Sequence, residues 1–310
     1  MLNMDRNYIS QLRQILERGS LTQAELAKRL GVTFAALNRW IHGHAKPHAQ
    51  RIRAIERLYK EVVGYPSLTP EELKQLVDKA KALKKRRLWN FIASHQPLQD
   101  ELLLEHTYNS NAIEGSTLTK RETEAVVFHK TVVPDHSLVE HLEVTNHAAV
   151  LRKIFDKKYQ GPVSEAFIKE LHKDLLQGIR DDHGEYSKHQ RAIRGVPIAL
   201  THPEDVPEEM GHLIRSWRSR PSKKTVKEIA KFHVDFELIH PFGDGNGRVG
   251  RLVMTFQCLQ FDDLPVIIEN ARKAEYYDVL EYAQRKSIGP FIAFLVDEME
   301  RTRTILQKYL

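Results

Sequence analysis

Apolar residues recur every three or four positions along most of the chain, which is the spacing of one buried helical face. Near the N-terminus this pattern predicts two short helices on either side of Gly31 and a third that contains Ile52 and Leu58. Thr22 and Glu25 have capping-box spacing, in which each side chain satisfies an unpaired backbone N–H of the first helical turn. We therefore expect a small helical bundle at the start of the chain.

A change in composition follows this bundle. Gly64–Pro70 contains two prolines and small polar residues, which is typical of a linker. A basic helix containing "KALKKRRLW" is expected after it. We therefore predict a first domain at 1–63, a linker and connecting helix at 64–98, and a second domain at 99–310.

The second domain also follows the helical pattern. A helix over about 100–114 stops at Gly115, and Thr119 with Glu122 begins the next helix with a second capping box. The further predicted helices cover about 137–158, 164–176, 205–219, 225–239, 247–261, 273–286 and 290–308.

One stretch departs from the helical pattern. Gly184–Leu200 alternates between apolar and polar residues and carries a turn-like Arg194-Gly195, so it predicts a β-hairpin. The expected fold class is therefore all-α, with one small hairpin.

The composition is that of a globular protein in a reducing compartment. Of the 310 residues, 41% are hydrophobic and 28% are charged. Cys258 is the single cysteine, so no intrachain disulfide can form, which fits a cytoplasmic location. The N-terminus lacks the features of a signal peptide, and the longest apolar runs are too short to span a membrane.

The positive charge is concentrated in the first sixty residues. They contain 11 Lys and Arg against 4 Asp and Glu, whereas the other 250 residues contain 36 and 37. A local basic excess favours a polyanionic partner for this part of the chain.

The string "HPFGDGNGRVGR", His240–Arg251, is the most informative stretch. Pro241 ends the preceding helix, and Gly243, Gly245 and Gly247 let the backbone turn sharply and approach a ligand. A glycine loop at a helix N-terminus offers unpaired N–H groups and the positive end of the helix dipole, which suits a phosphate.

The side chains of this string add to that chemistry. Arg248 and Arg251 share a helical face, and two guanidinium groups suit a polyphosphate. Asp244 beside an anion indicates a bridging Mg²⁺, and His240 is the one side chain here that accepts a proton near neutral pH. The string predicts a site for a nucleotide, a metal and a hydroxyl nucleophile; the alternative is a glycine-rich turn beside a core histidine. It lacks the GK[ST] of a Walker loop.

The same string resembles the signature of the Fic family, HPFxxGNGRxxR, and matches every defining position. Fic proteins are α-helical enzymes that mostly transfer AMP from ATP to a hydroxyl of a target protein, and the resemblance covers about 70–310. It implies that His240 is the general base and that Asp244 holds Mg²⁺. It also implies phosphate contacts from Gly245, Asn246, Gly247, Arg248 and Arg251.

Two further stretches resemble Fic proteins. The predicted hairpin corresponds to the family's flap, which pairs with the main chain of the target. Its turn residues are Ile193, Arg194, Gly195 and Val196. "ARKAEYYDVLEYAQ" resembles the stretch in which a tyrosine contacts adenine, so Tyr276 or Tyr277 would do so here; Gln284 stands where the family often has Asn.

"SNAIEG", Ser110–Gly115, resembles the inhibitory motif [S/T]xxxE[G/N] of the same family. The resemblance implies that Glu114 pairs with Arg251, which then cannot hold the γ-phosphate of ATP. In some family members the same glutamate orients water for AMP removal, so Glu114 has two implied roles.

"LTQAELAKRLGVTFAALNRWIHGHAKP" resembles the helix-turn-helix of Xre- and Cro-like repressors. The second helix would enter the major groove of DNA, and Lys46, His48 and Arg51 would reach phosphates. The candidate base contacts are Phe34, Ala35, Asn38 and Arg39. The alternative is a helical bundle that docks on a protein.

These patterns predict a self-inhibited protein adenylyltransferase that uses ATP and Mg²⁺ and binds duplex DNA through residues 1–60. Its other partner would be a target protein bearing a hydroxyl group. Three alternatives stay open: a transcription regulator that only senses nucleotide, a transferase with another phosphate donor, and an enzyme that removes AMP. The histidines form no zinc set, and the sequence leaves a homodimer open.

Overall fold

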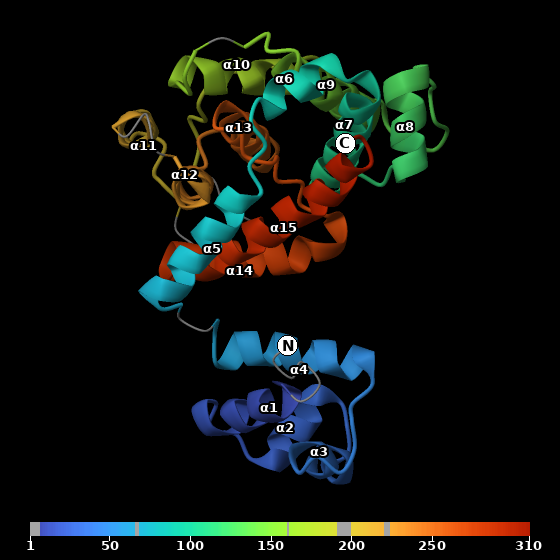
Figure 1. Cartoon of the computed structure of the whole chain (residues 1–310), viewed down its shortest axis with the longest axis vertical. Helices are drawn as coiled ribbons and strands as arrows, with labels where there is room; N and C mark the ends of the chain where they lie inside the picture. Colours follow the sequence, from blue (N-terminus) through green and yellow to red (C-terminus); the bar gives the residue numbers. More distant parts are fainter. Residues whose placement is uncertain (1–6, 66–67, 160, 191–199, 220–223) are drawn as a thin grey trace. The chain divides into compact units, whose positions relative to one another are not determined.

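The computed structural model describes residues 7–65, 68–159, 161–190, 200–219 and 224–310 (Figure 1). All regular structure in these ranges is helical. The chain divides into two compact units, Met1–Pro66 and Ser67–Leu310. None of the described helices combines the length and apolar character that a bilayer crossing requires.

The described part of the first unit folds as α1 (Asn7–Arg18), α2 (Gln23–Leu30), α3 (Phe34–Ile41) and α4 (Ala49–Val62). The Thr22 capping box forms as expected. The core residues with no exposed surface are Leu12, Ile15, Leu26, Leu37 and Ile55. The sequence analysis did not predict α1, although Leu12 and Ile15 have a helical spacing that indicates it.

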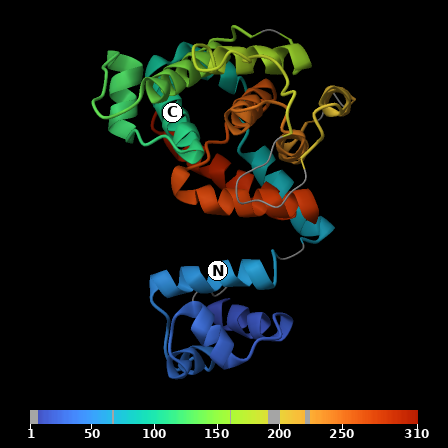
Figure 2. The same cartoon turned by 180° about the vertical axis from the view of Figure 1, so that it is seen from behind.

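The second unit is built around α13 (Asn246–Gln260), nearly all of whose residues are buried. The other described α-helices of the unit are α5 (Pro70–Ala82), α6 (Leu88–Ser94), α7 (Gln96–Glu114), α8 (Lys120–His129), α9 (Leu138–Phe155), α10 (Glu165–Leu175), α11 (Val206–Arg218), α12 (Val226–Ile239), α14 (Lys273–Arg285) and α15 (Gly289–Gln307). The neighbours of α13 are α6, α7, α10 and α12, and both views show it among them (Figures 1 and 2).

The segment 64–98, expected to connect two domains, contributes α5 and α6 to this second unit. α5 packs on α12 and α15, and α6 packs on α7, α9 and α13. The prediction of one basic helix through "KALKKRRLW" is wrong, because residues 83–87 separate α5 from α6. Lys84 Nζ there donates to the carbonyl oxygen of Phe261 and to Asp263, at 2.8 and 2.9 Å. These long-range contacts stabilise the turn at residues 83–87, which the local sequence does not indicate.

The predicted β-hairpin is only partly described. Residues 184–190 and Leu200 contain no strand. The predicted flap residues Ile193, Arg194, Gly195 and Val196 lie outside the described residues, so the hairpin stays a prediction.

Candidate active site

His240 ends α12 at the entrance of the glycine-rich loop. Its φ of +51° is left-handed, and its backbone N–H donates to the Phe236 carbonyl oxygen at 2.9 Å. Nδ1 of His240 lies 3.3 Å from the carbonyl oxygen of Glu237. Since a carbonyl only accepts, Nδ1 carries the ring hydrogen and Nε2 is the nitrogen that can accept a proton. The side chain is 20% exposed, so it meets the surface.

Asn246 closes the loop. Its side-chain amide accepts from the Phe242 N–H at 2.9 Å and donates to the Phe242 carbonyl oxygen at 2.8 Å. The side chain is buried and its amide bonds the loop backbone, so the backbone N–H of Asn246 is the better candidate for the anion contact that the resemblance implies. Gly245, with φ +76°, then begins α13, and no side chain caps that helix N-terminus.

Arg248 is a buried residue in the first turn of α13. It is 2% exposed and donates from Nη1 to Glu143 on α9 at 2.6 Å. Its Nη2 lies 3.6 Å from Asp244, whose side chain is 49% exposed. Its Nε is buried and has no hydrogen-bond partner among the described residues. The sequence patterns did not identify Glu143.

Arg251 is held by the end of α7. Its Nε and Nη2 donate to the Ser110 hydroxyl and carbonyl oxygens at 2.9 and 3.0 Å, and Nη2 also donates to Glu114 at 2.6 Å. Burial is the largest single influence and would lower the pKa of Arg251, but the Glu114 carboxylate together with the nearby Tyr276 and Tyr277 raises it. An added Cβ on Gly247 would lie 2.3 Å from Glu114 Oε1, so this approach requires glycine. The structure thus brings together the two residues that the inhibitory motif pairs.

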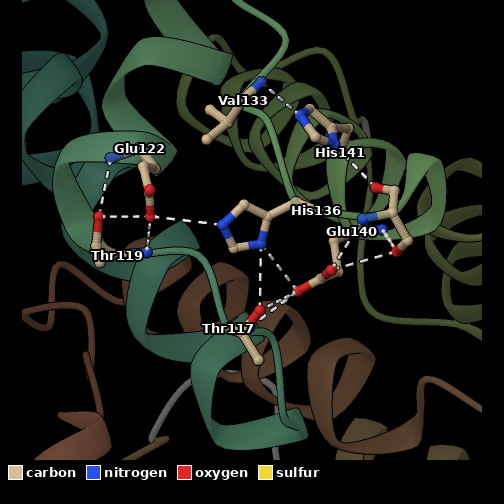
Figure 3. Close-up of polar contacts among 8 residues, drawn as sticks. Thr117, Thr119, Glu122, Val133, His136, Glu140 and His141 are labelled. Carbon is tan, nitrogen blue, oxygen red and sulfur yellow. Dashed lines mark hydrogen bonds and ion pairs between the residues drawn. The ribbon is translucent and has the colours of Figure 1, made fainter.

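The segment after α7 is fastened to the start of α9 (Figure 3). Thr117 donates from its N–H and hydroxyl to one Glu140 oxygen at 3.0 and 2.8 Å, and these bonds hold the Glu140 pKa at about 2. The His136 ring lies between Glu140 and Glu122, at 3.6 and 3.7 Å. Because Thr117 follows Glu114 by three residues, these contacts fasten the chain just beyond the end of α7.

A buried polar cluster lies behind His240. Glu237 is 5% exposed, and burial raises its pKa to about 8. Gly250 allows this close packing, since an added Cβ would lie 2.6 Å from Glu237 Oε1. His233 Nε2 and the Tyr276 hydroxyl are hydrogen bonded at 2.8 Å. This cluster supports the helix end that presents His240.

The two candidate adenine contacts differ in exposure. Tyr276 is 1% exposed and bonded to His233, which is typical of a core residue. Tyr277 is partly exposed, and its pKa is raised by burial and then by the nearby Glu114 carboxylate. Gln284 is also partly exposed. Tyr277 is therefore the better candidate of the pair for the expected adenine contact.

The predicted DNA contacts lie on the surface of α3. Phe34 is 53% exposed, Ala35 and Arg39 are exposed, and Asn38 is partly exposed. Arg51, expected to reach a phosphate, donates from Nη1 to the Leu30 carbonyl oxygen at 2.7 Å and so completes the end of α2.

Buried titratable groups predict how stability depends on pH. Burial lowers the pKa of four histidines, namely His106, His147, His172 and His233. They stay neutral in the folded chain while the unfolded chain protonates below about pH 6.5, so their contribution is lost as pH falls. Glu237 keeps its proton when folded, so its contribution is lost as pH rises towards 8.

We expect the free energy of unfolding to be greatest near neutral pH and to fall on both sides, by up to about 1.4 kcal/mol per pH unit for each group. Urea titrations from pH 5 to 8 measure this. The Glu237→Gln variant should lose less stability between pH 7 and 8 than the parent. If the parent and the Glu237→Gln variant lost the same stability between pH 7 and 8, the raised pKa assigned to Glu237 would be contradicted.

Each of the two units contains a match to a known protein family. The model of the Fic/DOC family matches residues 162–258, and a helix-turn-helix model matches residues 12–62. Residues 162–258 form a Fic/DOC domain. The Fic match contains α10, α11, α12 and all but the last two residues of α13, and therefore the whole loop from His240 to Arg251. The Fic match begins after α7, so Ser110 and Glu114 lie outside it.

Similar proteins agree with this assignment. The chain is 33% identical over 229 residues to the protein adenylyltransferase Fic of Nematostella vectensis, covering 71% of this chain and 53% of that protein. It is 32% identical over 213 residues to the Aedes aegypti protein of the same name, covering 66% and 42%. The chain thus spans about half the length of the curated relatives it matches.

The solved structure of a Fic domain containing signaling protein from Bacteroides thetaiotaomicron is also similar. Its TM-score is 0.62 at 28% identity, covering 75% of this chain and 95% of that one. A Fic family protein from Desulfovibrio desulfuricans gives a TM-score of 0.66 at 25% identity, covering 78% and 76%. The helical fold of the second unit is therefore that of Fic proteins.

Proposed function

We propose that this chain is a protein adenylyltransferase that transfers AMP from ATP to a hydroxyl group of a protein and is held inactive by Glu114. The observation that carries the proposal is the loop geometry. One loop places a proton acceptor, His240, an exposed carboxylate, Asp244, and the uncapped start of α13 together. The relatives named protein adenylyltransferase support the choice of AMP as the transferred group.

The residues around the start of α13 fit a magnesium-bound triphosphate. Arg248 Nε and Arg251 Nη1 are buried donors without hydrogen-bond partners among the described residues, and phosphate oxygens would satisfy them. No group of three or more His, Cys, Asp or Glu within the described ranges could hold a metal. Asp244 would therefore hold Mg²⁺ together with phosphate oxygens and water, and the bound ion would neutralise phosphate charge.

The proposed transfer is a displacement at the α-phosphorus. The target hydroxyl oxygen forms a bond to the α-phosphorus, and the bond to the oxygen that bridges to the β-phosphate breaks. Pyrophosphate leaves with that electron pair, and the hydroxyl proton passes to Nε2 of His240. Backbone N–H groups of Asn246 and Gly247 would stabilise the charge that develops on the phosphoryl oxygens.

The test is incubation of the Glu114→Gly chain with ATP and Mg²⁺, alone and with a lysate, followed by mass spectrometry of the proteins. An AMP adduct on the chain or on another protein supports the proposal. The absence of any AMP adduct, with the fold intact by circular dichroism, contradicts it.

We also propose that the first unit binds duplex DNA through α3. The helix-turn-helix match, the exposed face of α3 and the basic excess of the first sixty residues support this. In a selection from random-sequence duplexes, the parent chain should enrich one sequence class. Its affinity should fall as salt rises, because bound phosphates release counterions.

The Arg39→Ala variant should bind the enriched duplex about 5- to 150-fold more weakly, which is the usual cost of losing a base-contacting arginine. Arg57→Ala removes the same charge from an exposed position on α4 and serves as the control, with a smaller expected effect. Equal losses in both variants would mean that only net charge matters and would contradict base contact by Arg39. Fluorescence anisotropy at two salt concentrations measures both variants.

A further inference from the structure

His172 on α10 is a buried histidine to which the reaction proposed above gives no role. It is 1% exposed, and its ring stacks on that of Phe242 at a centroid distance of 3.8 Å and an interplanar angle of 5°. Phe242 is the third residue of the loop that begins at His240. The stacking therefore sets α10 directly against the loop proposed to perform the chemistry.

Two hydrogen bonds define the tautomer of His172. The Gly184 N–H donates to Nδ1 at 2.7 Å, so Nδ1 is an acceptor and carries no hydrogen. Nε2 therefore bears the hydrogen and donates it to the backbone carbonyl oxygen of Asp244 at 3.1 Å. Both ring nitrogens are thus committed, one to each of two segments that are far apart in the sequence.

These segments meet elsewhere as well. The Ser187 N–H donates to the Pro241 carbonyl oxygen at 2.9 Å. Asp244 is fixed on its other side, because its carboxylate accepts from the Gly245 N–H at 2.6 Å. With its carbonyl held by His172 and its carboxylate held by the next residue, the Asp244 side chain has little freedom to turn.

We infer that His172 is a positioning residue that fixes Asp244 for the metal-bound nucleotide and ties the loop to the segment around Gly184. This inference rests on the proposed function. The residue acts through Asp244, in the way that hydrogen-bond partners of metal ligands orient those ligands. Loss of such partners usually costs about 10- to 100-fold in metal affinity or activity.

Three substitutions separate the contacts of His172. Phenylalanine keeps the flat ring against Phe242 but makes neither hydrogen bond. Glutamine places an amide near the position of Nε2 and keeps the bond to Asp244. Asparagine places its amide near the position of Nδ1 and keeps the bond to Gly184. The parent is the full chain with Glu114→Gly, and circular dichroism shows whether each variant folds.

The first measurement is ATP affinity by calorimetry, with Mg²⁺ and with a chelator. In His172→Phe and His172→Asn, the affinity measured with Mg²⁺ should fall about 10-fold or more, with a much smaller change in the chelator. His172→Gln should stay close to the parent. Equal affinities with Mg²⁺ in all four chains would overturn the inference, as would losses of the same size with and without Mg²⁺.

The second measurement needs no nucleotide. Amide hydrogen exchange of residues 242–246 should accelerate in His172→Phe and His172→Asn but not in His172→Gln, because only glutamine keeps the bond to the loop. Unchanged exchange in all variants would also overturn the inference. If the His172 variants show the expected exchange pattern but the parent transfers no AMP, the result would count against the proposed function and not against the role of His172.

Discussion

Replacing Glu114 with glycine should raise AMP transfer by about 100-fold. Glu114 bonds Arg251 at 2.6 Å in the chain described here, and Ser110 holds the same guanidinium group at two further points. In the proposed mechanism, Arg251 aligns the end of the triphosphate, and this pairing would prevent it from doing so. A displacement of about an ångström at the reacting atoms can cost about 100-fold in rate, which sets the expected gain. A gain of this size requires the equilibrium between the paired and unpaired states of Arg251 to shift by only a few kcal/mol.

The measurement is the initial rate of AMP incorporation from labelled ATP, with equal amounts of parent and variant. Glu105→Gly is a matched control, because Glu105 lies on the same helix but pairs with Lys120. It makes the same glycine substitution without touching Arg251. A rate increase in both variants would mean that weakening α7 is enough to raise AMP transfer. Equal rates in all three chains would contradict inhibition by Glu114.

The loop could be predicted from the sequence because its determinants are local. Pro241 and the glycines end one helix and begin another wherever the rest of the chain lies. The pairing of Glu114 with Arg251 is different, since the partners are 137 positions apart in the sequence. Spacing along the chain carries no signal for such a contact, and the inhibitory motif indicated it only through resemblance to the Fic family.

Glu143 and His172 show where local reasoning ends. Glu143 meets Arg248 only because α9 packs where it does, and nothing in the neighbouring residues distinguishes it from a solvated glutamate. His172 lies on the apolar face of α10, where the ordinary interpretation is a core residue. The break between α5 and α6 has the same origin, because Lys84 finds its partners at Phe261 and Asp263 after the chain has folded.

Replacing His240 with alanine in the Glu114→Gly background should lower AMP transfer by at least about 100-fold, the low end of what a general base contributes. ATP binding should persist, because the phosphate contacts proposed here come from α13 and Asp244 and not from the imidazole. The His212→Ala control makes the same substitution at an exposed position on α11. Labelled ATP gives the rate, and calorimetry gives the affinity.

The same variant separates an enzyme from a nucleotide-sensing regulator. In a regulator, ATP would change the affinity for the enriched DNA duplex, and His240→Ala would leave that change intact because no proton transfer is involved. In the proposed enzyme, transfer would fail while DNA binding stayed at the parental level. If His240→Ala transferred AMP at the parental rate, the proton would have to go to another group, and no other side chain in the string from His240 to Arg251 accepts one near neutral pH. Retained transfer would therefore contradict the proposed mechanism at its central step.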